Sequence, residues 1–89
     1  LASANDELKV RTYALWSAEN RLISYRIATD LPAIGRNTFD CSQGDVPLSC
    51  QEDVFSTPHP LMRRIEISVF SGGPERRQLG QLTGFASTN

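Results

Sequence analysis

The chain has 89 residues, which is too few for two hydrophobic cores and close to the size at which burial becomes marginal for one domain. Nine basic residues are balanced by ten acidic ones, giving a net charge of −1, so nothing supports a nucleic-acid or acidic-membrane partner. The longest apolar runs are only a few residues long, so these residues contain no transmembrane segment and no visible signal peptide.

The first predicted element is a long helix from about Asn5 to about Thr29, with Asn5 or Asp6 as its N-cap. Its central stretch contains no Gly or Pro and is rich in good helix formers. Pro32 disfavours helical geometry at the residue before it, and Gly35 follows, so the helix should end shortly before this point.

The helix is predicted to be amphipathic, because its apolar residues gather on one side when plotted at about 100° per residue. The apolar stripe contains Leu8, Leu15, Ala18, Leu22, Ile23 and Tyr25. The opposite side contains Lys9, Tyr13, Ser17, Asn20, Arg21 and Ser24.

Two charged residues, Glu19 and Arg26, fall inside the apolar stripe. One interpretation places them at the edge of the stripe, where their charges reach water. The other is that a partner helix covers them and supplies the matching charge.

Strands are expected at about 36–40, 52–57, 61–70 and 76–86. The strongest is 61–70, in which apolar and polar residues alternate with the period of a strand. In the last strand Gly80 and Gly84 share one face and would let a helix approach closely, while Leu79 shares the other face with Thr83 and Phe85. Which face meets the helix stays open. One helix followed by three or four antiparallel strands predicts an α+β fold.

Cys41 and Cys50 bracket a loop in which Gly44 and Pro47 favour turns. The spacing predicts a disulfide, which would contribute roughly 2.5–3 kcal/mol and indicate an oxidising compartment. The alternative is a pair of free thiols in a cytosolic protein. We expect this loop to lie away from the helix, and two cysteines with one distant histidine are too few ligands for zinc.

The sequence offers no set of residues typical of an active site. His59, the single histidine, lies between two prolines and is predicted to be a surface residue. No nucleophile elbow or phosphate-binding loop is present. Four carboxylates near the cysteines match no calcium loop and are predicted to be solvated: Asp40, Asp45, Glu52 and Asp53. We therefore expect no catalytic residues, no cofactor and no metal.

Two arginine pairs, Arg63–Arg64 and Arg76–Arg77, flank the last two predicted strands. They are predicted to be solvated edge charges that discourage unwanted strand addition.

The run A-L-W-S-A-E-N-R-L, from Ala14 to Leu22, resembles the helix signature of the type II secretion minor pseudopilins of the I class. M-R-R-I-E-I-S-V, from Met62, and L-T-G-F, from Leu82, resemble the last two strands of that family in the same order.

The resemblance implies a pilin-like fold, with the long helix packed on a small antiparallel sheet in a single domain, 1–89. It implies a non-enzymatic subunit that joins J- and K-class pseudopilins at the pseudopilus tip, for export of folded proteins across the outer membrane. It also implies that an apolar helix, cut off before Leu1, anchors the domain at the inner membrane, with the domain in the periplasm of a Gram-negative bacterium. The expected partner-binding face of the helix contains Leu8, Leu15, Trp16, Glu19, Leu22 and Ile23, and Asn20 matches the same signature.

Two other function classes remain open. A minor pilin of a type IV pilus would be favoured by a long C-terminal disulfide loop, whereas Cys41 and Cys50 lie in the middle of the chain. A small secreted enzyme or inhibitor would also suit one disulfide, but the missing bases and nucleophiles argue against the enzyme.

Overall fold

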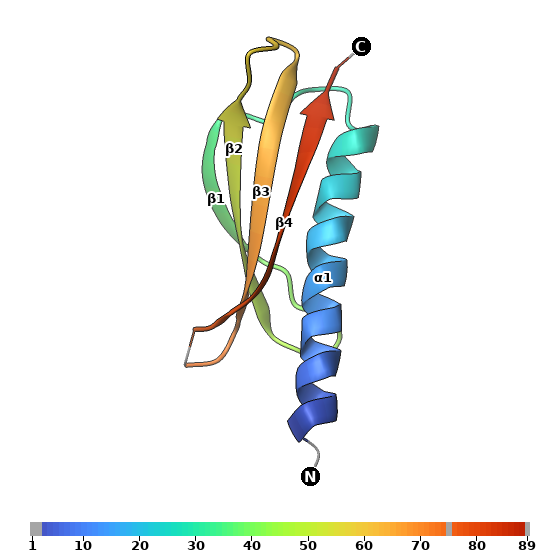
Figure 1. Cartoon of the computed structure of the whole chain (residues 1–89), viewed down its shortest axis with the longest axis vertical. Coiled ribbons are helices and arrows are strands. Elements are labelled where there is room, and N and C mark those ends of the chain that lie inside the picture. Colours follow the sequence, from blue (N-terminus) through green and yellow to red (C-terminus); the bar gives the residue numbers. More distant parts are fainter. Residues whose placement is uncertain (1–2, 75, 89) are drawn as a thin grey trace.

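The computed structural model describes residues 3–74 and 76–88, and the side chains from residue 7 onward. Its elements are α1 (Ser3–Ile27), β1 (Gly35–Asp40), β2 (Leu48–Ser56), β3 (Met62–Ser71) and β4 (Gln78–Ser87). The four strands form one antiparallel sheet in the order β1-β2-β3-β4, and α1 runs along it beside β4 (Figure 1). The predicted α+β fold, with one N-terminal helix on a small antiparallel sheet, is confirmed.

Element boundaries differ from the prediction at several ends. Helix α1 begins at Ser3, so Asn5 and Asp6 lie within the helix and the predicted N-cap is wrong. The helix ends at Ile27, two residues before the predicted end. Strand β2 begins at Leu48, four residues early, because the segment before the predicted strand already pairs with β1 and β3.

The cysteine loop is the end of the β1–β2 hairpin. Gln43 and Val46 exchange both backbone hydrogen bonds, at 3.1 and 2.9 Å. Gly44, with φ of 57°, is the first of the two residues between them, which is where a type II′ turn requires a positive φ. The hairpin register therefore continues past both strands to the turn.

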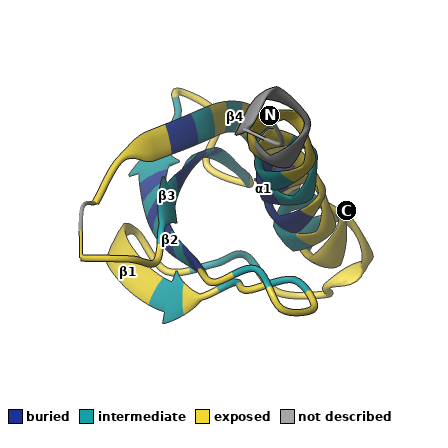
Figure 2. Ribbon diagram, turned by 90° about the horizontal axis from the view of Figure 1, so that it is seen from below, coloured by how far each residue is buried: buried dark blue, intermediate teal, exposed yellow. Residues whose placement is uncertain are grey.

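The core lies between the helix and one face of the sheet (Figure 2). Ile65, Ile67 and Val69 of β3 are fully buried there, and Ala14 and Ala18 of α1 pack against this cluster. Because alanine side chains are small, the helix axis can lie close to the sheet.

The glycine face of β4 is the one that meets the helix. A Cβ atom built on Gly84 would lie 2.9 Å from Leu22 Cδ2, whereas one built on Gly80 meets nothing within 4 Å. The close approach predicted from the two glycines therefore occurs at Gly84. Leu79 is also buried, because a register shift between Val69 and Phe70 places it in the core despite its predicted phase.

The predicted roles of the arginine pairs are partly wrong. Arg63 and Arg64 belong to β3, an inner strand, so neither is an edge charge. Arg64 lies on the face away from the helix, 4.2 Å from the Phe55 ring centroid, and forms an ion pair with Glu66. The inner strand lets an arginine cover an aromatic ring and pair with a neighbouring carboxylate.

The second pair precedes β4 rather than lying in it. Arg76 stacks over Phe70 with its guanidinium carbon 4.0 Å from the ring centroid, and Arg77 lies 3.5 Å from Glu7 of the helix. Both contacts are at the surface, so we expect each to contribute little to the stability of the domain.

Candidate partner-binding helix face

The side of α1 that meets the sheet is partly polar. Ser17, Arg21 and Tyr25 follow one another at four-residue spacing, so they lie in one line. Ser17 and Arg21 were expected to face away from the apolar stripe, and the sheet side was not identified. They turn inward because β2 offers them a charged partner and the hairpin offers a carbonyl.

The charged partner is Glu52, which points from β2 toward the helix and is only 3 % exposed. Arg21 Nε donates to Glu52 Oε2 at 2.6 Å, and Arg21 Nη2 donates to Oε1 at 3.3 Å. The Arg21 guanidinium carbon also lies 4.3 Å from the centroid of the Phe39 ring. The prediction that Glu52 is solvated is therefore wrong, and its burial is possible because the charge is paired at two points.

Tyr25 completes this cluster. Its hydroxyl donates to Glu52 Oε1 at 2.6 Å. Burial disfavours the phenolate, and the hydrogen bond to the Glu52 carboxylate favours the neutral phenol, so the pKa of Tyr25 rises to about 12. The Glu52 hydrogen bond likewise raises the pKa of Arg21, so the guanidinium stays protonated.

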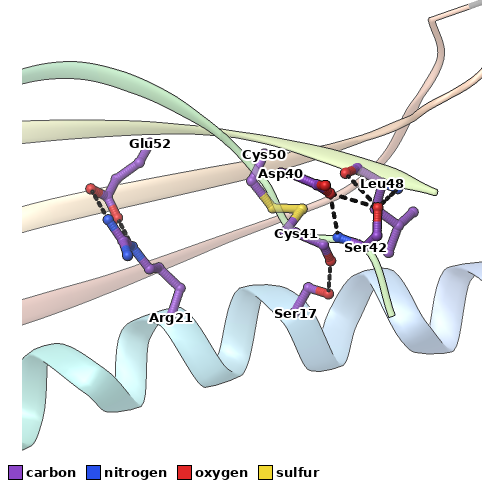
Figure 3. Close-up of a disulfide and its surroundings, with 8 residues drawn as sticks. All are labelled: Ser17, Arg21, Asp40, Cys41, Ser42, Leu48, Cys50 and Glu52. Atoms are coloured by element: carbon purple, nitrogen blue, oxygen red, sulfur yellow. Dashed lines mark hydrogen bonds and ion pairs between the residues drawn. A yellow bond between two sulfur atoms is a disulfide. The ribbon is translucent and has the colours of Figure 1, made fainter. Parts of the chain in front are cut away.

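The predicted disulfide between Cys41 and Cys50 is present, and no cysteine is free (Figure 3). Cys50 is fully buried, and the Cys41 carbonyl accepts a hydrogen bond of 2.8 Å from Ser17 Oγ. The expectation that the cysteine loop lies away from the helix is wrong. The hairpin end is anchored to α1, because the register that continues to the turn brings Cys41 under the helix.

The opposite side of α1 carries large apolar side chains that the domain does not cover. Leu8 is 66 % exposed, Trp16 and Ile23 are each 50 % exposed, and Leu15 is 45 % exposed. Together with Glu19, which is also exposed, these residues form what we call the outer helix face. Of the six residues predicted for a partner-binding face, five lie here, whereas Leu22 is half-buried against Gly84.

Trp16 is held in place from its own helix. Its ring centroid lies 5.4 Å from that of Tyr13, at an interplanar angle of 42°. Lys9 Nζ in turn lies 5.6 Å from the Tyr13 ring centroid. A side chain already fixed by such contacts loses little rotamer freedom when a partner covers it.

Glu19 and Arg26 lie on either side of a shallow surface depression of about 250 Å³, together with Leu22 and Ile23. Both charged residues are exposed, and within the described part of the chain neither has an ion pair or side-chain hydrogen bond. The isolated domain therefore leaves the two charges available to a partner.

Among residues 3–74 and 76–88 no cluster of side chains is arranged to hold a metal ion. Asp53 pairs with Arg36, Glu52 pairs with Arg21, and no three His, Cys, Asp or Glu side chains among the described residues gather around a common point. His59 Nδ1 accepts a hydrogen bond from the Leu61 backbone at 3.1 Å, within the turn before β3. In residues 3–74 and 76–88, no helix has the length and mean hydropathy needed to span a membrane.

The family model described as "Type II secretion system (T2SS), protein I" matches residues 8–87, which includes most of α1 and the whole sheet. A comparison with curated proteins finds no match. The matched region contains both the outer helix face and the polar contacts that orient the helix on the sheet. The chain therefore belongs to the family of type II secretion system protein I and is a type II secretion pseudopilin.

Proposed function

We propose that this domain is a structural, non-enzymatic subunit of the pseudopilus tip, where it assembles with J- and K-class pseudopilins for export of folded proteins. In this proposal, an N-terminal helix of the full-length protein anchors it at the inner membrane, and the domain lies in the periplasm. The family match supports association with other pseudopilins. The disulfide supports an oxidising compartment such as the periplasm.

The observation that carries the proposal is the set of exposed apolar side chains on the outer helix face. Leu15, Trp16 and Ile23 are about half exposed although the domain has a complete core on the other side of the same helix. Exposed apolar groups gathered on one surface mark interaction sites. A helix that uses one side for its own sheet and keeps the other apolar is suited to pack against the helix of a neighbour.

Charge complementarity defines the expected partner more closely. A neighbour that covers Ile23 would also cover Glu19, which lies beside it at the depression. Because a buried carboxylate needs a donor, the partner should place an arginine, lysine or backbone N–H opposite Glu19. Arg26, at the other side of the depression, would then face a carboxylate or a carbonyl of the partner.

Titration calorimetry with the periplasmic domain of the J-class pseudopilin from the same secretion system tests this proposal. Glu19→Ala should weaken binding more than tenfold, because loss of one member of a buried charge pair typically costs about 2–5 kcal/mol. Asp45→Ala removes an exposed carboxylate from the hairpin turn, on a different element, and should leave binding unchanged.

An apolar pair of variants provides a second comparison. Ile23→Ser on the outer helix face should weaken binding, whereas Ile34→Ser, at a residue 58 % exposed in the loop before β1, should not. Equal affinities for both members of each pair would place the interface elsewhere on the domain.

A further inference from the structure

Strand β1 forms an edge of the sheet, and it carries opposite charges, Arg36 and Asp40, at equal distances on either side of Thr38. Within the described residues it pairs only with β2, so its other side has no strand partner. All of its side chains are exposed except Phe39, and it contains no proline. Figures 1 and 2 both place β1 at the opposite side of the sheet from α1.

The backbone groups that point away from β2 can be assigned from the hairpin register. In an antiparallel ladder, hydrogen-bonded and non-hydrogen-bonded residue pairs alternate. The Gln43–Val46 pair exchanges both of its bonds, and Cys41 N donates to Leu48 O at 3.1 Å. Since every second residue forms these bonds, the hydrogen-bonded positions continue from 43 and 41 to residues 39, 37 and 35, whose backbone groups point toward β2. The N–H and C=O groups of Arg36, Thr38 and Asp40 therefore point to the open edge.

These same three residues also share one face of the sheet, since side chains alternate along a strand. It is the face away from the helix, because the Phe39 ring lies under the Arg21 guanidinium on the other face. A positive charge, a threonine and a negative charge thus stand at equal spacing along the open edge, at Arg36, Thr38 and Asp40.

We infer that β1 is a pairing edge for a second copy of this chain, joined antiparallel with the two Thr38 residues opposite each other on a twofold axis. In this register Arg36 of each copy stands opposite Asp40 of the other. The opposed pairs Arg36–Asp40 and Thr38–Thr38 consist of residues whose N–H and C=O groups point outward, so each of these pairs can exchange two backbone hydrogen bonds, and they alternate with non-hydrogen-bonded pairs of Asn37 and Phe39. Opposite charges directly across a strand pair are favourable, and both such pairs are present by symmetry.

Both charged side chains retain capacity for a second partner. Arg36 Nε donates to Asp53 at 2.7 Å, which leaves the terminal nitrogens of the guanidinium as further donors. Asp40 accepts two hydrogen bonds from Ser42, both at Oδ1, and in the described part of the chain Oδ2 has no bond. Natural edge strands often carry like charges that repel a second copy, whereas this edge carries charges that complement one.

The pairing does not depend on the proposed function, because the outer helix face lies on another side of the domain and stays uncovered. A single strand pair buries little surface, so the association should be weak. Sedimentation velocity of the 89-residue chain should show a monomer–dimer equilibrium with a Kd between about 10 µM and about 1 mM. A monomer at all concentrations up to about 1 mM would overturn the inference.

Charge variants test the register. Arg36→Glu alone and Asp40→Lys alone should each abolish self-association, since each places like charges opposite one another. An equimolar mixture of the two variants should form a dimer, because both opposed pairs then consist of unlike charges. Persistent dimers of either single variant, or a mixture that stays monomeric, would contradict this register.

Two further variants separate the edge from other surfaces. Thr38→Pro removes an N–H that points away from β2, so the fold should tolerate it while self-association weakens at least tenfold. Ile23→Ser, on the outer helix face, should leave the dimer unchanged. If instead Ile23→Ser abolishes the dimer and Thr38→Pro does not, the copies associate through the helix and the inference fails.

Disulfide cross-linking between the two copies tests the position of the twofold axis. Residues opposite each other in a hydrogen-bonded pair have Cα atoms about 5.5 Å apart, which a disulfide can span. Thr38→Cys should therefore form a linked dimer under mild oxidation. Asn37→Cys should not, because its opposite residue is Phe39 of the second copy. Equal linking by both variants would contradict the proposed axis.

Discussion

Arg21 of α1 and Glu52 of β2 form a two-point ion pair across the interface between helix and sheet, with N···O distances of 2.6 and 3.3 Å. The pair is asymmetric, since the side chain of Glu52 is 4 % exposed and that of Arg21 is 33 % exposed. Because Tyr25 donates to the same carboxylate, this cluster, together with the buried Ala14 and Ala18, holds one side of the helix against the sheet. Its opposite side is therefore the outer helix face.

The asymmetry predicts unequal effects of removing each charge. Arg21→Met should cost about 3 kcal/mol of unfolding free energy, because it leaves the Glu52 carboxylate buried without its counter-ion. Glu52→Gln should cost only about 1 kcal/mol, because Arg21 reaches solvent and Tyr25 keeps a hydrogen-bond acceptor. Urea denaturation at pH 7 measures both values. A double variant, Arg21→Met with Glu52→Leu, should be more stable than Arg21→Met alone, and equal costs for the two single changes would contradict the asymmetry.

The raised pKa of Tyr25 predicts a loss of stability in alkaline solution. The folded-state value is about 12, above the value near 10 expected for an unfolded chain. The stabilisation that comes from the raised pKa of Tyr25 is therefore fully present below pH 10 and is lost as the pH rises from 10 to 12. After discounting for partial exposure, the loss should be between about 1 and 2 kcal/mol.

Because other groups also titrate in this range, the measurement compares the chain with Tyr25→Phe. The variant should be less stable at pH 8, and the difference between the two should shrink toward pH 12. A difference that stays constant over this range would show that Tyr25 is not selectively protonated in the folded state.

The helix and β3 were predicted well because their side chains follow simple periods. The apolar residues of α1 and the alternation in β3 report local geometry, which depends only on neighbours in the chain. Five residues expected on a partner-binding face, from the family resemblance and their helical positions, lie on the outer helix face, and their binding role stays a prediction: Leu8, Leu15, Trp16, Glu19 and Ile23. The Cys41–Cys50 disulfide was predicted from the short spacing of the two cysteines and from the turn residues Gly44 and Pro47 between them.

What could not be predicted is which side of the helix meets the sheet. The periodicity treats Ser17 and Arg21 as solvent-facing polar residues, because their partners, the Cys41 carbonyl and Glu52, lie 24 and 31 residues away in sequence. One signal was available: polar residues at four-residue spacing on the helix, and a carboxylate in phase with apolar neighbours on β2. The half-burial of Leu22 was not predicted for the same reason, because its contact with Gly84 is a tertiary feature.

The close contact between Gly84 and Leu22 predicts that alanine substitution has different effects on stability at the two glycines of this face of β4, Gly84 and Gly80. Gly84→Ala should destabilise the domain by about 1–2 kcal/mol, because the new methyl group would lie within 2.9 Å of Leu22 Cδ2. Gly80→Ala meets nothing within 4 Å and should be neutral or slightly stabilising, since alanine loses less backbone entropy on folding. Thermal unfolding of the two variants and of the unchanged chain measures these effects on stability.

A compensating change tests the physical reason. Adding Leu22→Ala to Gly84→Ala should remove the clash, so the double variant should be more stable than the sum of the two single effects predicts. Additive effects would indicate that the cost of Gly84→Ala does not come from Leu22.

The disulfide should stabilise the fold without forming the partner surface. Replacing both cysteines, Cys41→Ser with Cys50→Ser, should lower the unfolding free energy by roughly 2.5–3 kcal/mol, because the unfolded chain gains freedom. Where the double variant is folded, its affinity for the J-class domain should be unchanged, since the Ser17 contact of Cys41 lies on the sheet side of α1. Denaturation and calorimetry measure these two quantities separately.

Thiol titration provides the matching control. The native chain should show no reactive thiol until it is reduced in denaturant, because Cys50 is fully buried and bonded to Cys41. Two reactive thiols per chain before reduction would contradict the disulfide.

The most direct test of the central claim is an amide chemical-shift map of the isotopically labelled domain, titrated with the unlabelled J-class periplasmic domain. The account predicts that the largest changes follow the outer helix face, at Leu15, Trp16, Glu19 and Ile23, while β1 and the face of the sheet away from α1 change little. Changes concentrated on the sheet, with the amides of α1 unaffected, would contradict it.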